Sequence, residues 1–372
     1  MKKKILININ TTWNIFNFRL SLIKELQNNG HEIIAVAPKD KYVDELEAIG
    51  VKCFNIKLKP QGTNPIIDLN LIIQYYKLFK IIKPDIVLSY TIKPNVYGNF
   101  ALCLLGIPVI NNISGLGTVF IKNSFTTSIV KFLYKLILRS STHVFFQNEK
   151  DQNLFIKLNI IKFHKCSVIP GSGVNVEKFN CERTKNPGNK YLFVGRLISD
   201  KGVIEYLESA VSIIKYYPNK EFLLCGELDY DNKTAISIKE LKYYTDNYSQ
   251  IKYLGKTDNI VKLLSEIDVM VLPSYREGLS KSLIEAAAMS LPIITTNVPG
   301  CKEVVEDGLN GFLCELKSRK SLENAILKMI NLSNDKRLQM GLNGRLKIIN
   351  TFTDEIVNNI YLNKINKILK IK

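Results

Sequence analysis

Two glutamates, Glu277 and Glu285, bracket a loop and the beginning of a helix in the segment SYREGLSKSLIEA, residues 274–286. A buried strand signal at 269–273 precedes this segment, and a helix is predicted over 283–289. In open parallel α/β sheets, ligands bind at the carboxyl ends of strands, where such a loop would lie. The first N–H groups of a helix lack internal partners and can hold phosphate, while carboxylates accept hydrogen bonds from hydroxyl groups. An anion site between two hydroxyl acceptors predicts binding of a sugar nucleotide.

A basic pair follows another predicted strand, at 191–194. The loop after this strand carries Gly195, Arg196 and Lys201. Arginine offers a planar fork for two phosphate oxygens, and lysine offers a compact charge for a third. Taken alone, such a pair is typical of a solvated loop. Because the carboxyl ends of parallel strands meet at one edge of a sheet, the pair and the segment 274–286 together predict a single diphosphate site.

Length and composition are those of an ordered globular protein with two domains. The chain has 372 residues, of which 46% are hydrophobic and 23% charged, which is enough to bury two cores. Its 7 cysteines are scattered without a C-x-x-C pair, which favours small core residues in a reducing compartment over disulfides or a zinc site. No apolar run approaches the roughly 18 residues of a membrane span, and no secretory signal is visible. We therefore expect a cytoplasmic protein.

The net charge of +17 is unevenly distributed along the chain. Residues 1–180 hold 23 Lys and Arg against 11 Asp and Glu, and between Asp68 and Glu149 the only acidic residue is Asp85. Such asymmetry favours an anionic partner for the N-terminal half, namely a membrane surface, a lipid phosphate or a nucleic acid. The alternative is a compositional bias toward Lys, Asn and Ile without functional meaning.

Alternating strand and helix patterns predict an α/β fold of two Rossmann-like domains with a ligand cleft between them. We place the domains at 1–178 and 179–352, and expect the amphipathic helix at 353–372 to pack back on the first domain. The strands expected in the first domain are 4–9, 32–37, 52–58, 86–90, 109–113 and 143–147, and the helices are 18–28, 42–49, 69–82, 96–105 and 126–139. In the second, the expected strands are 191–194, 221–225, 251–254, 269–272, 292–295 and 311–314, and the helices are 203–215, 234–244, 260–267, 283–289, 321–333 and 336–349.

Several motifs of the C-terminal half occur together in one known family. They are Gly195-Arg196 with Lys201, the E-x7-E pair Glu277 and Glu285, the segment VPGCKEVV at 298–305, and the segment GLNGF at 308–312. With these motifs the chain resembles the family-4 retaining glycosyltransferases of the GT-B fold. The N-terminal half is similar to a narrower group, bacterial enzymes that add a hexosamine or hexose to polyprenyl-diphosphate-linked saccharides of glycans, capsules or O-antigens. The marks of this group are NFRL at 17–20, YTIKPNVYG at 90–98 and SGLG at 114–117.

The resemblance implies a role for each residue of the predicted donor site. Arg196 and Lys201 would neutralise the diphosphate. Glu285 would accept from ribose hydroxyls, and Glu277 would contact the transferred sugar. The further donor-binding positions that the resemblance implies are Gly195, Gly226, Gly278, Ser280, Lys281, Ser282 and Leu283. The alternative for the two glutamates is structural, because acidic residues also favour the N-terminus of a helix.

The resemblance further implies a retaining reaction that needs no metal ion. Breaking the anomeric C–O bond gives the sugar oxocarbenium character and releases a nucleotide diphosphate. Fixed cations and helix amides would stabilise the growing negative charge. We expect no cofactor besides the nucleotide sugar, which is a UDP sugar, and we interpret the D-x-D string at 229–231 as a turn.

The N-terminal domain is expected to bind the acceptor. The loop predicted at 10–16 lacks the glycines that many relatives carry there, and Trp13 within it could stack on a sugar or simply pack. The residues assigned to the acceptor or sugar are Asn10, Trp13, Lys93, Asn95, Ser114, Gly115 and Gly117. Membrane contact is assigned to Lys131, Lys135 and Arg139, which fall on one side of a predicted helix. The alternative is a buried helix with its basic residues in solvent.

These patterns predict a peripheral enzyme on the inner face of the cytoplasmic membrane. It would move a sugar, an N-acetylhexosamine from a UDP donor, onto a polyprenyl-diphosphate-linked saccharide. One alternative with the same fold is a nucleotide-sugar epimerase or sugar-phosphate synthase that acts on soluble substrates. A second is a basic nucleic-acid-binding protein without catalytic activity, which we do not expect because no nucleic-acid-binding module is recognisable.

Overall fold

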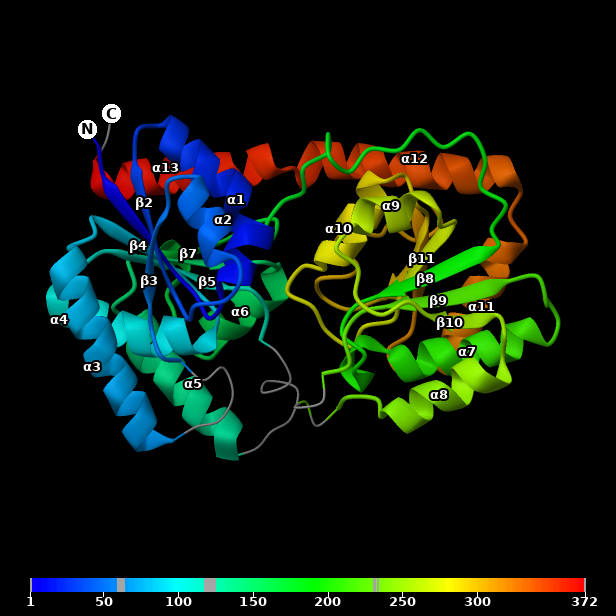
Figure 1. The fold of residues 1–372 in the computed structure, drawn as a ribbon, viewed down its shortest axis with the longest axis horizontal. Helices are drawn as coiled ribbons and strands as arrows, with labels where there is room; N and C mark the ends of the chain where they lie inside the picture. The colour runs from blue at the N-terminus through cyan, green and yellow to red at the C-terminus, as the bar shows by residue number, and fades with distance from the viewer. Residues whose placement is uncertain (1, 59–63, 117–124, 230–231, 233, 371–372) are drawn as a thin grey trace. The chain divides into compact units, whose positions relative to one another are not determined.

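The structure is a computed structural model that describes residues 2–58, 64–116, 125–229, 232 and 234–370. It forms two compact units, Met1–Ser172 with Asp354–Lys372, and Gly173–Thr353 (Figure 1). Each unit is built on a parallel sheet. The predicted α/β class, with two Rossmann-like domains, is therefore confirmed.

The sheet of the first unit has the strand order β3-β2-β1-β4-β5-β6-β7 among the described residues, with parallel neighbours throughout. Its strands are β1 (Lys4–Asn8), β2 (Glu32–Ala37), β3 (Lys52–Asn55), β4 (Ile86–Tyr90), β5 (Val109–Ile113), β6 (His143–Phe146) and β7 (Cys166–Val168). The chain order reverses between β1 and β4. Such a switch point leaves a crevice beyond the carboxyl ends of the two strands.

Alternation along the strands sends neighbouring side chains to opposite faces of this sheet. Ile5 and Ile7 of β1 pack in one hydrophobic cluster, while Leu6 packs in another on the opposite face. Strands β1, β2 and β4 are buried on both faces, as expected inside a parallel sheet covered by helices.

The last helix of the chain belongs to this first unit. The helices are α1 (Thr12–Asn28), α2 (Val43–Ala48), α3 (Pro65–Ile82), the π-helix η1 (Pro94–Gly98), α4 (Asn99–Leu105), α5 (Phe125–Leu138), α6 (Glu149–Lys157), the 3₁₀ turn η3 (Phe163–Lys165) and α13 (Asp354–Leu369). In Figure 1, α13 runs beside α1, and Val357, Tyr361 and Ile365 join the cluster that also holds Leu22 and Ile23 of α1. The C-terminal helix thus completes the core of the N-terminal sheet.

The sheet of the second unit has the order β10-β9-β8-β11-β12-β13 among the described residues, and it too is parallel. Its switch point lies between β8 and β11. Its strands are β8 (Lys190–Val194), β9 (Glu221–Cys225), β10 (Ile251–Tyr253), β11 (Val269–Leu272), β12 (Ile293–Thr296) and β13 (Gly311–Cys314). Its helices are the 3₁₀ turn η4 (Ser199–Lys201), α7 (Val203–Ile214), α8 (Ile238–Asn247), α9 (Ile260–Ser265), α10 (Lys281–Ala288), α11 (Arg319–Ile330) and α12 (Asn334–Thr351).

One local prediction about the first unit was wrong, and two of its elements were not predicted. The segment expected to be a loop up to residue 16 is already helical from Thr12, because Thr11 caps α1 by accepting from the Asn14 N–H at 3.1 Å. Asp40 also accepts hydrogen bonds from the Thr12 hydroxyl and the Trp13 N–H. In addition, α6 and β7 were not expected. Both are short, so hydrophobic periodicity gives little signal for them.

The buried His143 of β6 predicts a pH dependence of stability. Its Nε2 lies 2.9 Å from Ser167 Oγ, and burial, followed by the charges of Lys364 and Lys367, lowers its pKa from 6.5 to about 4. As the pH falls, His143 is protonated near pH 6.5 in the unfolded chain but only near pH 4 in the native protein. The native state therefore has its full stability above pH 6.5 and loses stability as the pH falls toward 4. In that window we expect the native protein to lose on the order of 2 kcal/mol more than a His143→Gln variant does. Urea unfolding at a series of pH values measures this, and equal slopes would contradict it.

Candidate functional site

The predicted donor residues gather at the switch point of the second unit. Lys201 ends the loop after β8, and Glu277 lies in the loop between β11 and α10. Lys201 Nζ donates to Glu277 Oε1, and the two side chains are only 21% and 12% exposed. A mostly buried ion pair at this edge of the sheet offers one cation and one possible acceptor for hydroxyl groups.

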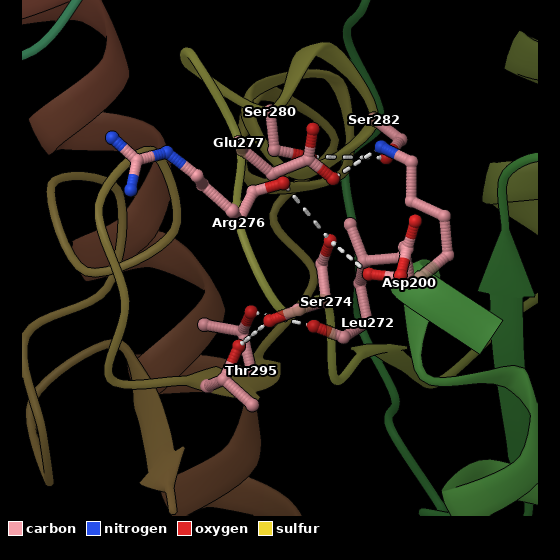
Figure 2. A network of polar contacts seen from close by, with 10 residues as sticks. Asp200, Leu272, Ser274, Arg276, Glu277, Ser280, Ser282 and Thr295 are labelled. Atoms are coloured by element: carbon pink, nitrogen blue, oxygen red, sulfur yellow. Dashed lines mark hydrogen bonds and ion pairs between the residues drawn. The ribbon is translucent and has the colours of Figure 1, made fainter. Parts of the chain in front are cut away.

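Ser274 ties together the loops that carry these two residues. Its fully buried side chain donates to the Asp200 carbonyl at 3.2 Å and lies 3.5 Å from the Arg276 carbonyl (Figure 2). The Tyr275 N–H donates to the same Asp200 carbonyl at 2.8 Å. Thr296, at the end of β12, donates its hydroxyl to the Ser274 carbonyl. The loops after three neighbouring strands are therefore held in one arrangement around the Lys201–Glu277 pair.

Close backbone contacts also fix these loops. Gly202, at φ +76°, leaves only 2.1 Å between an added Cβ and the Pro273 carbonyl oxygen. Gly300, at φ +80°, would place a Cβ 2.5 Å from that of Glu277. The Glu277 N–H donates to the Pro299 carbonyl at 3.1 Å, and the Ser280 N–H donates to the Gly300 carbonyl at 2.9 Å. The Pro-Gly turn after β12 thus sets the position of Glu277 and of the residue that precedes α10.

The thiol of Cys301, next to this turn, is a packing group. It is fully buried, and burial, together with the charge of Glu277, raises its pKa to about 12. The thiol therefore stays protonated at neutral pH, and no nucleophilic role is assigned to it.

Glycines bring the β8 and β9 loops close together. Gly226 has a φ of +153°, and a Cβ there would lie 1.8 Å from the Gly195 carbonyl oxygen. Gly195 itself donates its N–H to the Cys225 carbonyl at 3.0 Å. The structure therefore brings Gly195 and Gly226 together beside the switch point, as the predicted donor site requires.

Arg196 lies on the same loop but is more exposed. Its Nη1 donates to Asp229 Oδ2 at 2.9 Å, and its side chain is 57% exposed. Exposed ion pairs contribute little free energy, so the Arg196 guanidinium could leave Asp229 and bind a diphosphate at little cost. The remainder of the D-x-D string, residues 230–231, lies outside the described residues.

The remaining donor-site residues surround the start of α10. Ser280 precedes the helix with an extended backbone and is buried, and its Oγ lies 3.3 Å from Ser282 Oγ. Lys281 donates to the Gly173 carbonyl at 2.6 Å and lies 3.7 Å from Glu285 one turn later. Leu283 is buried in the core. Gly278 lies in the loop before the helix. Lys281 thus donates to a carbonyl of its own unit, and the Glu285 carboxylate lies beside Lys281 at the first turn of α10.

A pocket of about 270 Å³ occupies the switch point of the first unit. It is lined by residues that follow β1, β4 and β5, among them five predicted for the acceptor: Asn10, Lys93, Asn95, Ser114 and Gly115. Trp13 does not line it. The Trp13 ring packs edge-on against Phe18 at 5.3 Å. Gly117 lies outside the described residues.

Buried amides form the floor of this pocket. Asn95 Nδ2 donates to the Asn112 carbonyl at 2.9 Å, and Asn95 Oδ1 accepts from Asn111 Nδ2 at 3.0 Å. Asn112 Oδ1 accepts from the hydroxyl of Tyr361 on α13. Sequence analysis missed Asn111, Asn112 and Tyr361. The polar pair Asn111-Asn112 inside the strand predicted at 109–113 was the available signal, because buried amides need partners.

The predicted membrane helix α5 presents both basic and apolar side chains. Arg139, just after the helix, is exposed, and Lys131 and Lys135 are half-buried. Phe132 and Leu136 are 64% and 50% exposed.

Two further properties concern metals and membranes. Among the described residues, no group of three or more His, Cys, Asp and Glu side chains could hold a metal ion. Within the same part of the chain, no helix combines the length and the apolar character needed to cross a bilayer.

Family models match both halves of the chain. The model of the glycosyl transferases group 1 matches residues 176–347, and the model of the glycosyl transferase 4-like proteins matches residues 4–148. The first match includes the Lys201–Glu277 pair, and the second includes every described lining residue of the pocket of the first unit.

Two relatives are 29% identical to the chain over most of their length. One, from Campylobacter jejuni, is the N,N'-diacetylbacillosaminyl-diphospho-undecaprenol alpha-1,3-N-acetylgalactosaminyltransferase, and the match covers 88% of this chain and 89% of that protein. The other, from Escherichia coli, is the UDP-Gal:alpha-D-GlcNAc-diphosphoundecaprenol alpha-1,3-galactosyltransferase, with 85% and 82% covered. Among solved structures, Anabaena HepE in complex with UDP shares the fold, with a TM-score of 0.78 at 17% identity over 99% of this chain and 100% of that one.

Proposed function

We propose that this chain, which belongs to the glycosyltransferases by the family models that match both its halves, transfers a sugar from a UDP donor to a polyprenyl-diphosphate-linked saccharide. The observation that carries this proposal is the Lys201–Glu277 pair beside the start of α10. The sugar is an N-acetylhexosamine in our proposal, which the name of the Campylobacter jejuni relative supports.

In the proposed donor complex, Lys201 and Arg196 bind the diphosphate together with the first amides of α10. Glu285 accepts from the ribose, and Glu277 accepts from a hydroxyl of the transferred sugar. UDP as the nucleotide is supported by the name of the Escherichia coli relative and by the UDP bound to Anabaena HepE. Cations and helix amides at this position stabilise the charge that develops on the leaving diphosphate.

The proposed reaction needs no metal ion and retains the anomeric configuration. The anomeric C–O bond to the diphosphate breaks, and an acceptor hydroxyl oxygen forms the new bond on the same face of the sugar. The hydroxyl proton passes to the departing phosphate. The nucleotide diphosphate leaves with the electron pair of the broken bond, so no oxidant or reductant is involved.

A transfer assay tests the function directly. The purified chain is incubated with radiolabelled UDP-N-acetylgalactosamine, UDP-N-acetylglucosamine, UDP-galactose or UDP-glucose and a bacterial membrane extract. Labelled product in the lipid phase is the expected result. Transfer to soluble acceptors alone, or epimerisation of the donor, would contradict the lipid-linked acceptor and favour an enzyme of soluble substrates.

We also propose that α5 rests on the inner face of the membrane that holds the acceptor. Its exposed Phe132 and Leu136 lie one turn apart next to Lys131, Lys135 and Arg139. Apolar side chains beside basic ones are typical of helices that lie in an anionic interface.

A vesicle-binding experiment checks the role of α5. We expect the double variant Phe132→Ser/Leu136→Ser to bind vesicles of phosphatidylglycerol and phosphatidylcholine at least about tenfold more weakly than the unaltered chain, because two apolar side chains no longer enter the interface. Sedimentation with vesicles measures this. The matched control is Leu342→Ser/Leu346→Ser on α12, whose leucines are 49% and 57% exposed and also one turn apart. Equal losses in both variants would contradict the assignment to α5.

A further inference from the structure

We infer that the pocket of the first unit binds a neutral sugar residue of the acceptor and leaves the acceptor diphosphate outside. The identity of the ligand as an acceptor rests on the proposed function. The distinction between sugar and diphosphate rests on the charges and hydrogen bonds of the pocket itself. The volume of about 270 Å³ is close to the lower end of the roughly 300–1,000 Å³ range of small-molecule sites.

Backbone conformation marks this pocket as more than a packing gap. Thr91, in its wall, adopts φ +64°, which a β-branched residue rarely does. The π-helix Pro94–Gly98 follows directly, and single π-helical turns are frequent at functional sites. Both backbone conformations are energetically unfavourable, and strained backbone of this kind is concentrated at ligand-binding and active sites.

The charge of the pocket argues against a diphosphate. Lys93 is the charged side chain among the described lining residues, and its Nζ lies 3.4 Å from Asp68 Oδ1. The Asp68 carboxylate also accepts from the Tyr97 hydroxyl at 2.7 Å. Both members of the ion pair are about nine-tenths buried. In the proposed donor site a diphosphate has Arg196 and the first amides of α10 besides Lys201. Here it would meet Lys93 alone among the described charged lining residues, and it would have to take Lys93 from a carboxylate that would then stay buried without a counter-charge, which is costly.

The polar groups left for a ligand suit sugar hydroxyls. Within the described residues, Asn10 Nδ2 and the Ser114 hydroxyl make no hydrogen bond, and the Thr91 hydroxyl donates to the Tyr90 carbonyl at 2.6 Å but can still accept. A sugar hydroxyl both donates and accepts, whereas a diphosphate only accepts. Apolar side chains also line the pocket, namely those of Leu58, Ile92, Pro94, Ile113 and Tyr134, and they can cover the apolar face of a pyranose ring.

The amides of the floor are fixed by hydrogen bonds to each other and to residues behind the pocket wall. Asn112 is held by Tyr361 through its Oδ1, and the Tyr90 hydroxyl donates to that of Tyr361 at 3.1 Å. Asn95 is held at both ends of its amide by Asn112 and Asn111. These side chains therefore act as positioning residues that shape the floor, while Asn10, Thr91 and Ser114 supply the contacts.

Saturation-transfer NMR on the full chain tests the inference with N-acetylglucosamine, N-acetylgalactosamine, glucose and inorganic diphosphate as probes. We expect signal from at least one neutral sugar, no displacement of it by diphosphate, and an affinity about tenfold lower in Asn10→Ala/Ser114→Ala. The same substitution leaves UDP affinity unchanged, which shows that the chain is folded. Ser140→Ala, outside the pocket in the same unit, is the control and keeps the sugar affinity.

A variant that removes both charges of the Lys93–Asp68 pair distinguishes binding of a neutral sugar from binding of diphosphate. In Asp68→Asn/Lys93→Met the pair is removed without leaving a buried charge, and we expect sugar affinity within about twofold of the unaltered value. Loss of sugar binding in this variant, displacement of sugar by diphosphate, or no signal from any neutral sugar overturns the inference. Failure of UDP to bind would instead contradict the proposed function, so the two failures are distinguishable.

Discussion

Glu277→Gln is expected to lower the rate of sugar transfer by about a hundredfold while UDP still binds, about two- to fivefold more tightly than to the unaltered chain. The substitution keeps the shape of the side chain but removes its charge. A hydrogen bond from a sugar hydroxyl to a carboxylate is stronger than one to an amide, so the transition state loses stabilisation. UDP has no transferred sugar and does not use this contact.

Tighter UDP binding follows from the partner of Glu277. Lys201 Nζ bonds to Glu277, so a diphosphate must share that lysine with the carboxylate. Removing the carboxylate charge leaves the full charge of Lys201 to the phosphate oxygens. Lys201→Met should have the opposite signature, with weaker UDP binding and slower transfer together.

Calorimetric titration of UDP and steady-state transfer rates measure the two effects separately. Glu323→Gln is the matched control, because Glu323 pairs with Arg319 on the surface helix α11 and lies outside the proposed site. If Glu277→Gln weakened UDP binding in parallel with the rate, Glu277 would belong to the phosphate site. Transfer at nearly the unaltered rate would refute its contact with the sugar.

The arrangement of the proposed donor site could be predicted because its determinants are local. Glu277, the start of α10 and Glu285 lie within one short segment, so spacing along the chain fixes their geometry. The strand signals around it were strong, since parallel strands buried on both faces are almost continuously apolar. Once the strands were placed, the switch-point rule brought Lys201 to the same edge although 76 positions separate it from Glu277.

The pocket of the first unit could be predicted only in part. Asn10, Lys93 and Ser114 follow strands and were found for that reason, but the partner of Lys93 was not, because Asp68 lies on a helix whose register against η1 is a tertiary property. Tyr361 and Asn112 are 249 positions apart, and no local pattern links them. Contacts of this kind depend on how helices pack, which periodicity does not specify.

Gly300→Ala is expected to destabilise the second unit by about 2–4 kcal/mol and to lower transfer by at least about a hundredfold. Gly300 has φ +80°, and a Cβ would lie 2.5 Å from Glu277 Cβ and 2.6 Å from the Glu277 carbonyl oxygen. The loop that carries Glu277 would have to move. Chemical denaturation and the transfer assay measure the two consequences.

Gly308→Ala separates backbone strain from displacement of the site. Gly308 has φ +79°, but a Cβ there would meet nothing within 4 Å, so this variant carries the same conformational cost, about 1 kcal/mol, without the collision. We expect it to transfer sugar at nearly the unaltered rate; equal losses in both variants would show that the clash with Glu277 is unimportant. Because the Gly300 carbonyl also accepts from the Ser280 N–H at 2.9 Å, movement of Gly300 shifts Glu277 and the start of α10 together. Gly300→Ala should therefore weaken UDP binding as well as transfer, unlike Glu277→Gln, which is expected to slow transfer but to tighten UDP binding.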